Sequence, residues 1–227
     1  MPERYAIYGA EGSGRGAAPA ARAQLGPDAD LIFVDDNPDL HGGSVNGIPV
    51  MSFAQAAAER RLFNIAVALP ATRRLLVKRC GEEGLGFFTI TAPNHIRYDD
   101  VTVGEGGQFL AHTMVTANVR IGRHFHGNIY AYVEHDCEIG DFVTFGPRVN
   151  CNGRVVIEDG AYIGAGACLK QGLPGAPLVI GRNAVIGMGA VVTKNVPPGA
   201  TFVGNPARPL GEPARAPTPN GTRSKSK

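Results

Sequence analysis

The chain lacks the features that mark several common functional classes. Lysine and arginine do not cluster before the last dozen residues, and 22 basic against 20 acidic residues leave a formal charge of only +2. Because nucleic-acid binding normally needs a basic patch, a small ligand is the expected partner. The sequence also has no apolar run that suits a signal peptide or a membrane span.

Cysteine is scarce as well. The 227 residues contain four cysteines, at positions 80, 137, 151 and 168, and their spacing matches no zinc motif. We therefore expect a reduced, cytoplasmic protein that holds no metal.

Residues 1–92 have the pattern of a small α/β domain. An apolar run, "RYAIYG", enters a glycine-rich turn and an alanine-rich helical stretch, and a second apolar run follows in "DADLIFVDD". A third such run at 64–69 precedes a basic helix that begins at residue 70. These segments predict a Rossmann-like parallel sheet of three or four strands with helices.

The glycine turn and the acidic end of the second run suit a nucleotide. Backbone N–H groups at such a turn can bind phosphate, and Asp35 or Asp36 can reach a ribose hydroxyl. However, Gly9, Gly12 and Gly14 do not form the G-x-G-x-x-G fingerprint. A nucleotide site and a plain tight turn therefore both remain open.

Residues 93–211 are dominated by a six-residue period. An apolar or small residue keeps one frame over twelve consecutive positions: Val103, Phe109, Val115, Ile121, Gly127, Val133, Ile139, Phe145, Cys151, Ile157, Ile163 and Leu169. This period is typical of a parallel β-helix, in which each repeat is stable only on its neighbours. The chain then ends in residues 212–227, which are rich in Pro, Ser and basic residues and are expected to be disordered.

Known hexapeptide proteins form a left-handed, triangular coil with three repeats per turn, so residues eighteen apart should stack. In the column of Ile121, Ile139 and Ile157 the next apolar residue should be 175, but Ile180 takes that place. Five residues are thus inserted, around 172–177. The insertion is either a loop on a binding face or a tolerated surface insertion.

His135 is the strongest catalytic candidate. Asp136 beside it can accept a hydrogen bond from one ring nitrogen and leave the other free to accept a proton. Stacking places Ala117 one coil earlier, which leaves space, and Gly153 one coil later, whose N–H can donate to an oxyanion. The alternative is an exposed histidine on a corner of the coil.

The other histidines of the repeat region fit a catalytic or metal site less well. His112, His124 and His126 have no carboxylate next to them in the sequence. His112 and His124 are twelve residues apart, so they should lie on different faces and cannot share a metal. A β-helix of the γ-carbonic-anhydrase type, which needs three metal-binding histidines, is therefore disfavoured.

Taken together, these motifs resemble the sialic-acid O-acetyltransferase and bacillosamine-pathway sugar N-acetyltransferase family. The resemblance runs through residues 4–210. It rests on "IYGAEGSG", "FVDDN", "NGIPV", "VEHDCEIGDFV", the hexapeptides, "IGMGAVVTKNV" and "VGNPAR", in this order and spacing.

The resemblance implies a homotrimer of left-handed β-helices that bears N-terminal nucleotide-sugar domains, with acetyl-CoA between subunits. His135 is then the general base and Asp136 supports its basicity. Gly153, Ala165 and Thr144 are expected at the coenzyme. The residues expected at the nucleotide sugar are Gly12, Ser13, Gly14, Asp35, Asp36 and Asn128.

The chain departs from the family pattern at three places. Glu11 and Ser13 stand where the family commonly has "GGHG", and "ALPATR" replaces the usual "GN" or "GD" after the third strand. Thr144 replaces a second histidine nine residues past the base. These departures leave the nucleotide open, so UDP should not be assumed over GDP.

We expect acetyl transfer from acetyl-CoA to the amino group of a nucleotide-linked 4-amino-4,6-dideoxysugar, of the perosamine or bacillosamine type, in surface-glycan synthesis. Sugar O-acetylation would use the same residues. A third alternative is a nucleotide-sugar-binding β-helix without catalysis, which should lack a base or have a blocked column, whereas this chain keeps both His135 and Gly153.

Overall fold

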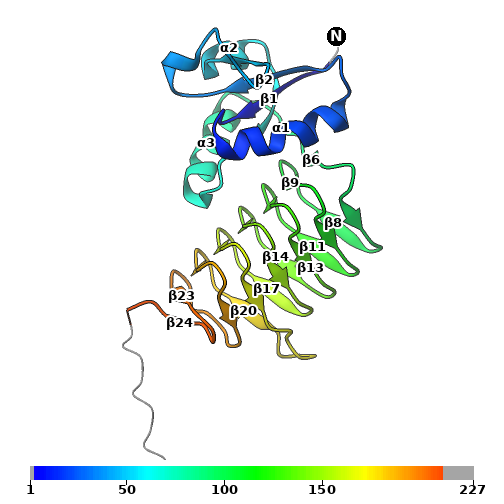
Figure 1. Ribbon diagram of the computed structural model, residues 1–227, viewed down its shortest axis with the longest axis vertical. Coiled ribbons are helices and arrows are strands. Elements are labelled where there is room, and N and C mark those ends of the chain that lie inside the picture. Colours follow the sequence, from blue (N-terminus) through cyan, green and yellow to red (C-terminus); the bar gives the residue numbers. More distant parts are fainter. Residues whose placement is uncertain (1–2, 212–227) are drawn as a thin grey trace, which may run out of the picture.

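The computed structural model describes residues 3–211, so the expected disorder of 212–227 lies outside the described residues. Figure 1 shows an N-terminal part of helices and strands above a stack of triangular coils that descends towards the C-terminus. Within residues 3–211, no helix is long and apolar enough to cross a membrane.

A five-stranded sheet forms the centre of the N-terminal part, in the order β3-β4-β2-β1-β5. All its pairings are parallel except the β3–β4 hairpin. Its strands are β1 Arg4–Tyr8, β2 Asp30–Val34, β3 Ser44–Val45, β4 Ile48–Met51 and β5 Leu62–Ile65. The helices are α1 Gly12–Leu25, η1 Pro38–Leu40, α2 Phe53–Ala58 and α3 Pro70–Glu82. The predicted Rossmann-like arrangement is therefore confirmed.

The sequence pattern missed some local structure here. The β3–β4 hairpin and α2 were not predicted, although α2 has a capping box between Ser52 and Gln55. The third strand, expected at 64–69, ends at Ile65 instead. The reason is that the carbonyls of Val67 and Ala68 turn to accept hydrogen bonds from Arg73.

Close packing between α1 and β1 explains one glycine of the turn. A Cβ on Gly14 would lie 1.7 Å from the carbonyl oxygen of Gly9 and 3.2 Å from the ring of Phe33. Gly12, two residues earlier, has open space around it. Gly14 is therefore needed for the approach of helix to strand, as in other strand–turn–helix units.

The coils form a left-handed β-helix with three flat faces, which we call A, B and C in the order in which the chain visits them. Face A contains β6 Ile90–Thr91, β9 Gln108–Phe109, β12 His126–Gly127, β15 Thr144–Phe145, β18 Tyr162–Ile163, β21 Val185–Ile186, β23 Thr201–Val203 and β24 Arg208–Pro209. Face B contains β7 Ile96–Arg97, β10 Met114–Val115, β13 Tyr132–Val133, β16 Asn150–Cys151, β19 Cys168–Leu169 and β22 Val191–Val192. Face C contains β8 Val101–Val103, β11 Val119–Ile121, β14 Glu138–Ile139, β17 Val155–Ile157 and β20 Leu178–Ile180.

The predicted register holds throughout. On face B, Val115 pairs with Val133 and Val133 with Cys151, eighteen residues apart. On face C, Ile157 pairs with Ile180, so the five-residue insertion lies where the sequence placed it. From Phe109 onward the repeating residues, apart from Gly127, form a single apolar core, in which each fully buried side chain stabilises the fold by about 1.5–3 kcal/mol.

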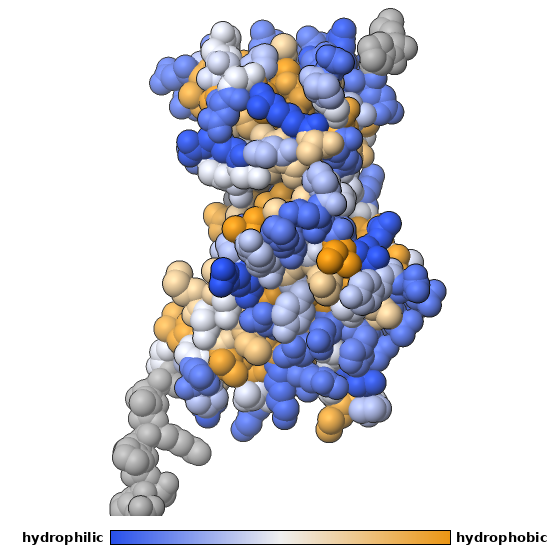
Figure 2. Space-filling view, turned by 45° about the vertical axis from the view of Figure 1, so that its right-hand side comes forward, coloured by the Kyte–Doolittle hydropathy of each residue, from blue (hydrophilic) through white to orange (hydrophobic). Residues whose placement is uncertain are grey.

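A polar junction joins the N-terminal part to face A. The fully buried Arg73 of α3 donates to the carbonyls of His124 and Phe142 and to the hydroxyl of Thr144. Asn64 and Gln108 pair beside it at 2.7 Å. Strand β6 pairs with β9 and is therefore the first strand of face A. Apolar side chains also gather at this narrow level on the surface in Figure 2.

The first prediction concerns the helix–strand contact. Gly14→Ala should destabilise the protein by about 1–3 kcal/mol, because the methyl group overlaps the Gly9 carbonyl. Gly12→Ala, in the same helical turn, is the matched control and should change the free energy of unfolding by less than about 1 kcal/mol. Urea unfolding measures both. Equal effects of the two substitutions would contradict the packing role of Gly14.

The second prediction concerns acid sensitivity at the junction. Burial, together with the charges of Arg73 and Arg123, lowers the pKa of His124 from 6.5 to about 4. Between these values the unfolded chain binds the proton more tightly, so His124 contributes stability that is fully present above pH 6.5 and lost as the pH falls towards 4. The loss is at most about 3 kcal/mol.

His124→Phe tests this term, because the ring lies against Phe142 and Phe87 and phenylalanine retains those contacts without a proton. The substitution also removes the charge that protonated His124 exerts on His126 and Asp141, so the difference between the two proteins includes this coupling. The variant should lose less free energy of unfolding than the wild type between pH 7 and pH 4.5. Parallel curves for the two proteins would rule out the contribution of His124.

Candidate active site

His135 lies on the corner between faces B and C, after β13 and before β14. The backbone places it in the predicted column: Asp136 N donates to Ala117 O at 3.2 Å, and Arg154 N donates to His135 O at 2.9 Å. Its side chain is 40% exposed. A histidine on this corner can therefore meet a ligand from solvent.

Gly153 lies directly beneath the His135 ring. A Cβ on Gly153 would be 2.6 Å from Cε1 and 2.7 Å from Nε2 of the ring. Any side chain at this position would displace the imidazole. The absence of a side chain also leaves the Gly153 backbone open to a ligand that contacts Nε2, which is the arrangement expected of a base beside an oxyanion donor.

Asp136 orients the imidazole. His135 Nδ1 lies 2.9 Å from Asp136 Oδ2, while Nε2 has no hydrogen-bond partner within residues 3–211. The bond assigns the proton to Nδ1 and leaves the lone pair on Nε2. The hydrogen bond from His135, aided by one from Asn118, lowers the pKa of the Asp136 carboxyl, which therefore stays ionised as its partner.

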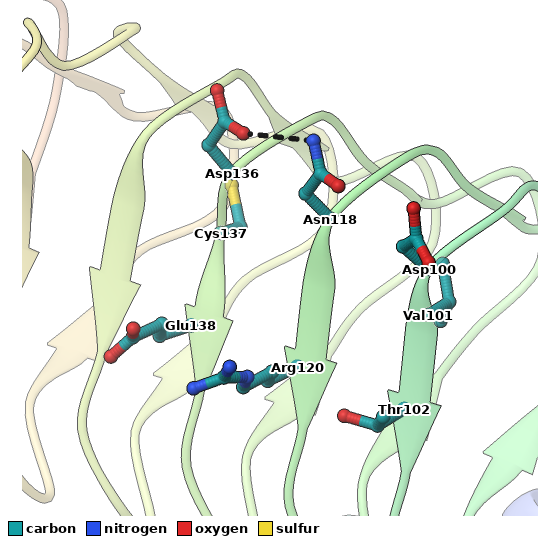
Figure 3. Close-up of a pocket in the computed structure, with 8 residues that line it drawn as sticks. All are labelled: Asp100, Val101, Thr102, Asn118, Arg120, Asp136, Cys137 and Glu138. Atoms are coloured by element: carbon teal, nitrogen blue, oxygen red, sulfur yellow. Dashed lines mark hydrogen bonds between the residues drawn. The ribbon is translucent and has the colours of Figure 1, made fainter.

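A groove of about 600 Å³ adjoins this corner on the outer side of face C. Figure 3 shows Thr102, Arg120 and Glu138 projecting from successive strands, with Asp136 and Asn118 joined by a hydrogen bond at the corner above them. The groove is lined by polar and charged groups, which suits a hydroxyl-rich ligand better than an apolar one.

The insertion at 172–177 lies on the same corner as His135, two coils further along. Gly172 N donates to Gly153 O at 2.9 Å, and Leu178 N donates to Arg154 O at 3.2 Å. Leu173, which pairs with Ala176 across the turn, is 67% exposed. The insertion therefore lies on the face of the coil that bears His135.

A second group of expected residues lies at the carboxyl edge of the N-terminal sheet. Gly12 and Ser13 are exposed in the first turn of α1, whereas Gly14 is buried. The first N–H groups of a helix have no partner within the helix, so this turn can bind an anion.

The two aspartates after β2 face this turn but differ in their contacts. Asp35 accepts hydrogen bonds from Ala10 N and Asn37 N at 2.9 and 3.0 Å, which shape the turn itself. Asp36 accepts from Tyr8 at 2.8 Å and pairs with Arg79 at 2.9 Å. Asp36 is more exposed, so it is the better placed of the two to meet a ligand.

A third group lies on the corner between faces A and B. Asn128 follows β12, and Ala165 follows β18. The corner around Ala165 is shallow, because Gly166 and Gly189 beside it have open space where a side chain would stand. Small residues here leave room for an extended ligand such as the pantetheine arm of coenzyme A.

The expected coenzyme contact of Thr144 does not fit this structure. Its side chain lies on face A under the N-terminal part, with only 4% of the residue exposed. The hydroxyl donates to Ala68 O at 2.8 Å and accepts from Arg73 at 2.9 Å. Thr144 therefore joins the two parts of the chain and has no free group for a coenzyme.

The three groups of residues do not meet within one chain. In a triangular coil the B–C corner, which bears His135, is the vertex opposite face A. Face A carries the N-terminal part with Asp35 and Asp36, and Ala165 lies on the separate A–B corner. His112 lies on the A–B corner and His124 on the corner between faces C and A, as expected from their spacing. Within residues 3–211 no group of three His, Cys, Asp or Glu side chains is arranged to hold a metal.

Two residues beside the base were not predicted from the sequence. Asn118 Nδ2 and Arg154 Nη2 both lie 3.3 Å from oxygens of Asp136. Positions 118, 136 and 154 are eighteen residues apart, so the same register that placed Ala117 and Gly153 around His135 would have found them.

Comparison with known proteins adds to this geometry. No family model matches the chain. It is 47% identical over 221 residues to the GDP-perosamine N-acetyltransferase of Escherichia coli O157:H7, which covers 94% of this chain and 98% of the relative. The chain belongs to the hexapeptide-repeat sugar N-acetyltransferases of the bacillosamine and perosamine type. It is thus an enzyme.

Solved structures agree with this family. WeeI from Acinetobacter baumannii AYE superimposes with a TM-score of 0.87 at 44% identity and covers 92% of this chain and 100% of its own. PerB from Caulobacter crescentus, in complex with CoA and GDP-perosamine, gives a TM-score of 0.82 at 25% identity over 93% and 99%. Both extend over the N-terminal part and the β-helix, so the whole described fold is that of the family.

Proposed function

We propose that this N-acetyltransferase transfers the acetyl group of acetyl-CoA to the 4-amino group of GDP-linked perosamine. The relative at 47% identity over 94% of the chain carries this proposal. The stacking of His135 over Gly153, with Asp136 on Nδ1, supplies the chemistry that the reaction needs.

In the proposed mechanism, the sugar amine attacks the carbonyl carbon of the thioester. His135 Nε2 accepts a proton from the amine as the C–N bond forms, and the Asp136 carboxylate stabilises the imidazolium that results. The tetrahedral intermediate then expels the thiolate, which takes up a proton and leaves as free CoA. The products are the N-acetylated sugar nucleotide and CoA.

Gly153 is proposed to stabilise the oxyanion of this intermediate. Its N–H donates no hydrogen bond to another backbone group within residues 3–211, and the missing side chain lets the thioester approach beside Nε2. A preorganised donor of this kind is worth on the order of 10²–10³ in kcat.

We propose that the working form is a homotrimer. The base on the B–C corner and the nucleotide edge beside face A lie on opposite sides of one coil, so a complete site needs a neighbouring chain. Cyclic symmetry would bring the A–B corner of one chain, with Asn128 and Ala165, to the B–C corner of the next.

The nucleotide and the acceptor atom rest on the relatives and on the sequence departures. The N-terminal turn carries Glu11 and Ser13 instead of the family's Gly-His, which is compatible with a nucleotide other than UDP. An amine acceptor, rather than a hydroxyl, follows from the activity of the Escherichia coli relative.

A thiol-release assay tests the reaction. The enzyme should release CoA from acetyl-CoA with GDP-perosamine and not with GDP-rhamnose, the 6-deoxy sugar nucleotide that has a hydroxyl in place of the amine, nor with GDP-mannose, which also has a hydroxyl at C6. The product should resist mild base as an amide. His135→Ala should lower kcat by about 10²–10⁴ while both dissociation constants stay within about two-fold. Substantial turnover of that variant, or acceptance of GDP-rhamnose or GDP-mannose, would contradict the proposal.

Subunit mixing tests the shared site. His135→Ala and Ala165→Glu, which blocks the A–B corner, should each inactivate the protein alone. When the two variants are co-expressed in equal amounts, random trimers should regain about a quarter of the wild-type sites, because base and corner come from different chains. If the site lay within one chain, every copy would keep one defect and activity would not return. Absence of recovery would therefore refute the shared site.

A further inference from the structure

A three-residue column fixes the carboxylate that orients the base. Asn118, Asp136 and Arg154 occupy the same place in three consecutive coils and share a left-handed backbone, with φ of 57°, 59° and 58°. Since their backbones superimpose along the helix, their side chains leave the corner side by side. This column runs beside the column of Ala117, His135 and Gly153.

The contacts of the Asp136 carboxylate come from all three coils. Oδ2 accepts from His135 Nδ1 at 2.9 Å and lies 3.3 Å from Arg154 Nη2, while Oδ1 accepts from Asn118 Nδ2 at 3.3 Å. Figure 3 shows the Asn118 bond running along the corner towards Asp136. The carboxylate is therefore held from both neighbouring coils.

This restraint matters because the pair is open to solvent. The side chains of His135 and Asp136 are 40% and 39% exposed, so water competes for the carboxylate and for Nδ1. An unrestrained aspartate rotates about its terminal torsion at little cost. The positive charge of the Arg154 guanidinium, 3.3 Å from Oδ2, attracts that oxygen and so opposes the rotation that would move it out of line with Nδ1–H.

Arg154 is itself well anchored. Its N–H donates to His135 O at 2.9 Å, and its carbonyl accepts from Leu178 N, the first residue after the insertion, at 3.2 Å. Its side chain is 30% exposed, less than that of either partner. The backbone of Arg154 is thus fixed at a position from which the guanidinium reaches Asp136.

We propose that Arg154 is a positioning residue that acts on the base through Asp136. It fixes the carboxylate so that the imidazole proton stays on Nδ1 and the lone pair on Nε2 faces the sugar amine. The inference rests on the proposed role of His135, and Arg154 itself touches neither substrate.

A double-mutant cycle measures this role. Arg154→Met keeps the length of the side chain and removes its charge, and it should lower kcat by about ten-fold with both KM values within about two-fold. Arg154→Lys, which restores a cationic donor, should recover most of that loss. In an Asp136→Asn background, Arg154→Met should have less than a two-fold further effect, because the group through which it acts is gone.

Three outcomes would overturn the inference: an unchanged kcat, an equal loss in both backgrounds, or a rise in KM at constant kcat, which would make Arg154 a ligand contact. Circular dichroism and thermal melting establish that each variant is folded. Arg154→Gln, which also removes the charge but keeps a polar side chain, provides the same comparison if Arg154→Met does not fold.

A readout without turnover separates this inference from the proposed function. ¹⁵N NMR of the His135 imidazole in the free trimer should show the proton on Nδ1 in the wild type and a mixture of tautomers in Arg154→Met. Identical spectra would refute the role of Arg154 whatever the substrate is. Failure of His135→Ala to lose activity would instead refute the proposed function and leave the tautomer result standing.

Discussion

The structure depends on one constraint, the closure of the coils between residues 90 and 169 in eighteen residues each. Closure in a fixed number of residues turns sequence distance into spatial contact, so that within these coils position i lies on positions i − 18 and i + 18, as Val115, Val133 and Cys151 do on face B. At most corners the sharp turn is made by a residue with a left-handed backbone, often not a glycine, as at His112, Tyr130 and Arg148. Because the register is rigid, a histidine, its glycine and its carboxylate can be held at a corner without any help from a loop or a lid.

That constraint also decides which parts of the site the sequence could predict. The column of Ala117, His135 and Gly153 could be predicted from the eighteen-residue spacing, because residues one coil apart stack on each other. The same spacing located the five-residue insertion and placed His112 and His124 on different parts of the coil. The α/β character of residues 3–92 was also predictable, because apolar runs and glycine turns have local signatures.

Contacts that do not follow the repeat, such as those between the N-terminal part and face A, could not be predicted from the sequence. Arg73 meets Thr144 across 71 residues, and nothing in the basic helix that contains Arg73 marks one arginine as buried. The hexapeptide frame put Thr144 on a face, but only the docked N-terminal part decides that this face is covered. The end of β5 was misplaced for the same reason. The carbonyls of Val67 and Ala68, just after the strand, accept hydrogen bonds from Arg73. This tertiary contact overrides the strand-like pattern of the local sequence.

The buried guanidinium of Arg73 has a further consequence for how a substrate would travel. It is held by carbonyls from both parts of the chain, from Val67 and Ala68 on one side and from His124 and Phe142 on the other. Rotating one part against the other would strip a desolvated cation of its acceptors, which is costly. The N-terminal part is therefore held in a fixed orientation on the β-helix. A nucleotide bound at its edge would be delivered by assembly geometry alone, and turnover would need no hinge between the two halves of the chain.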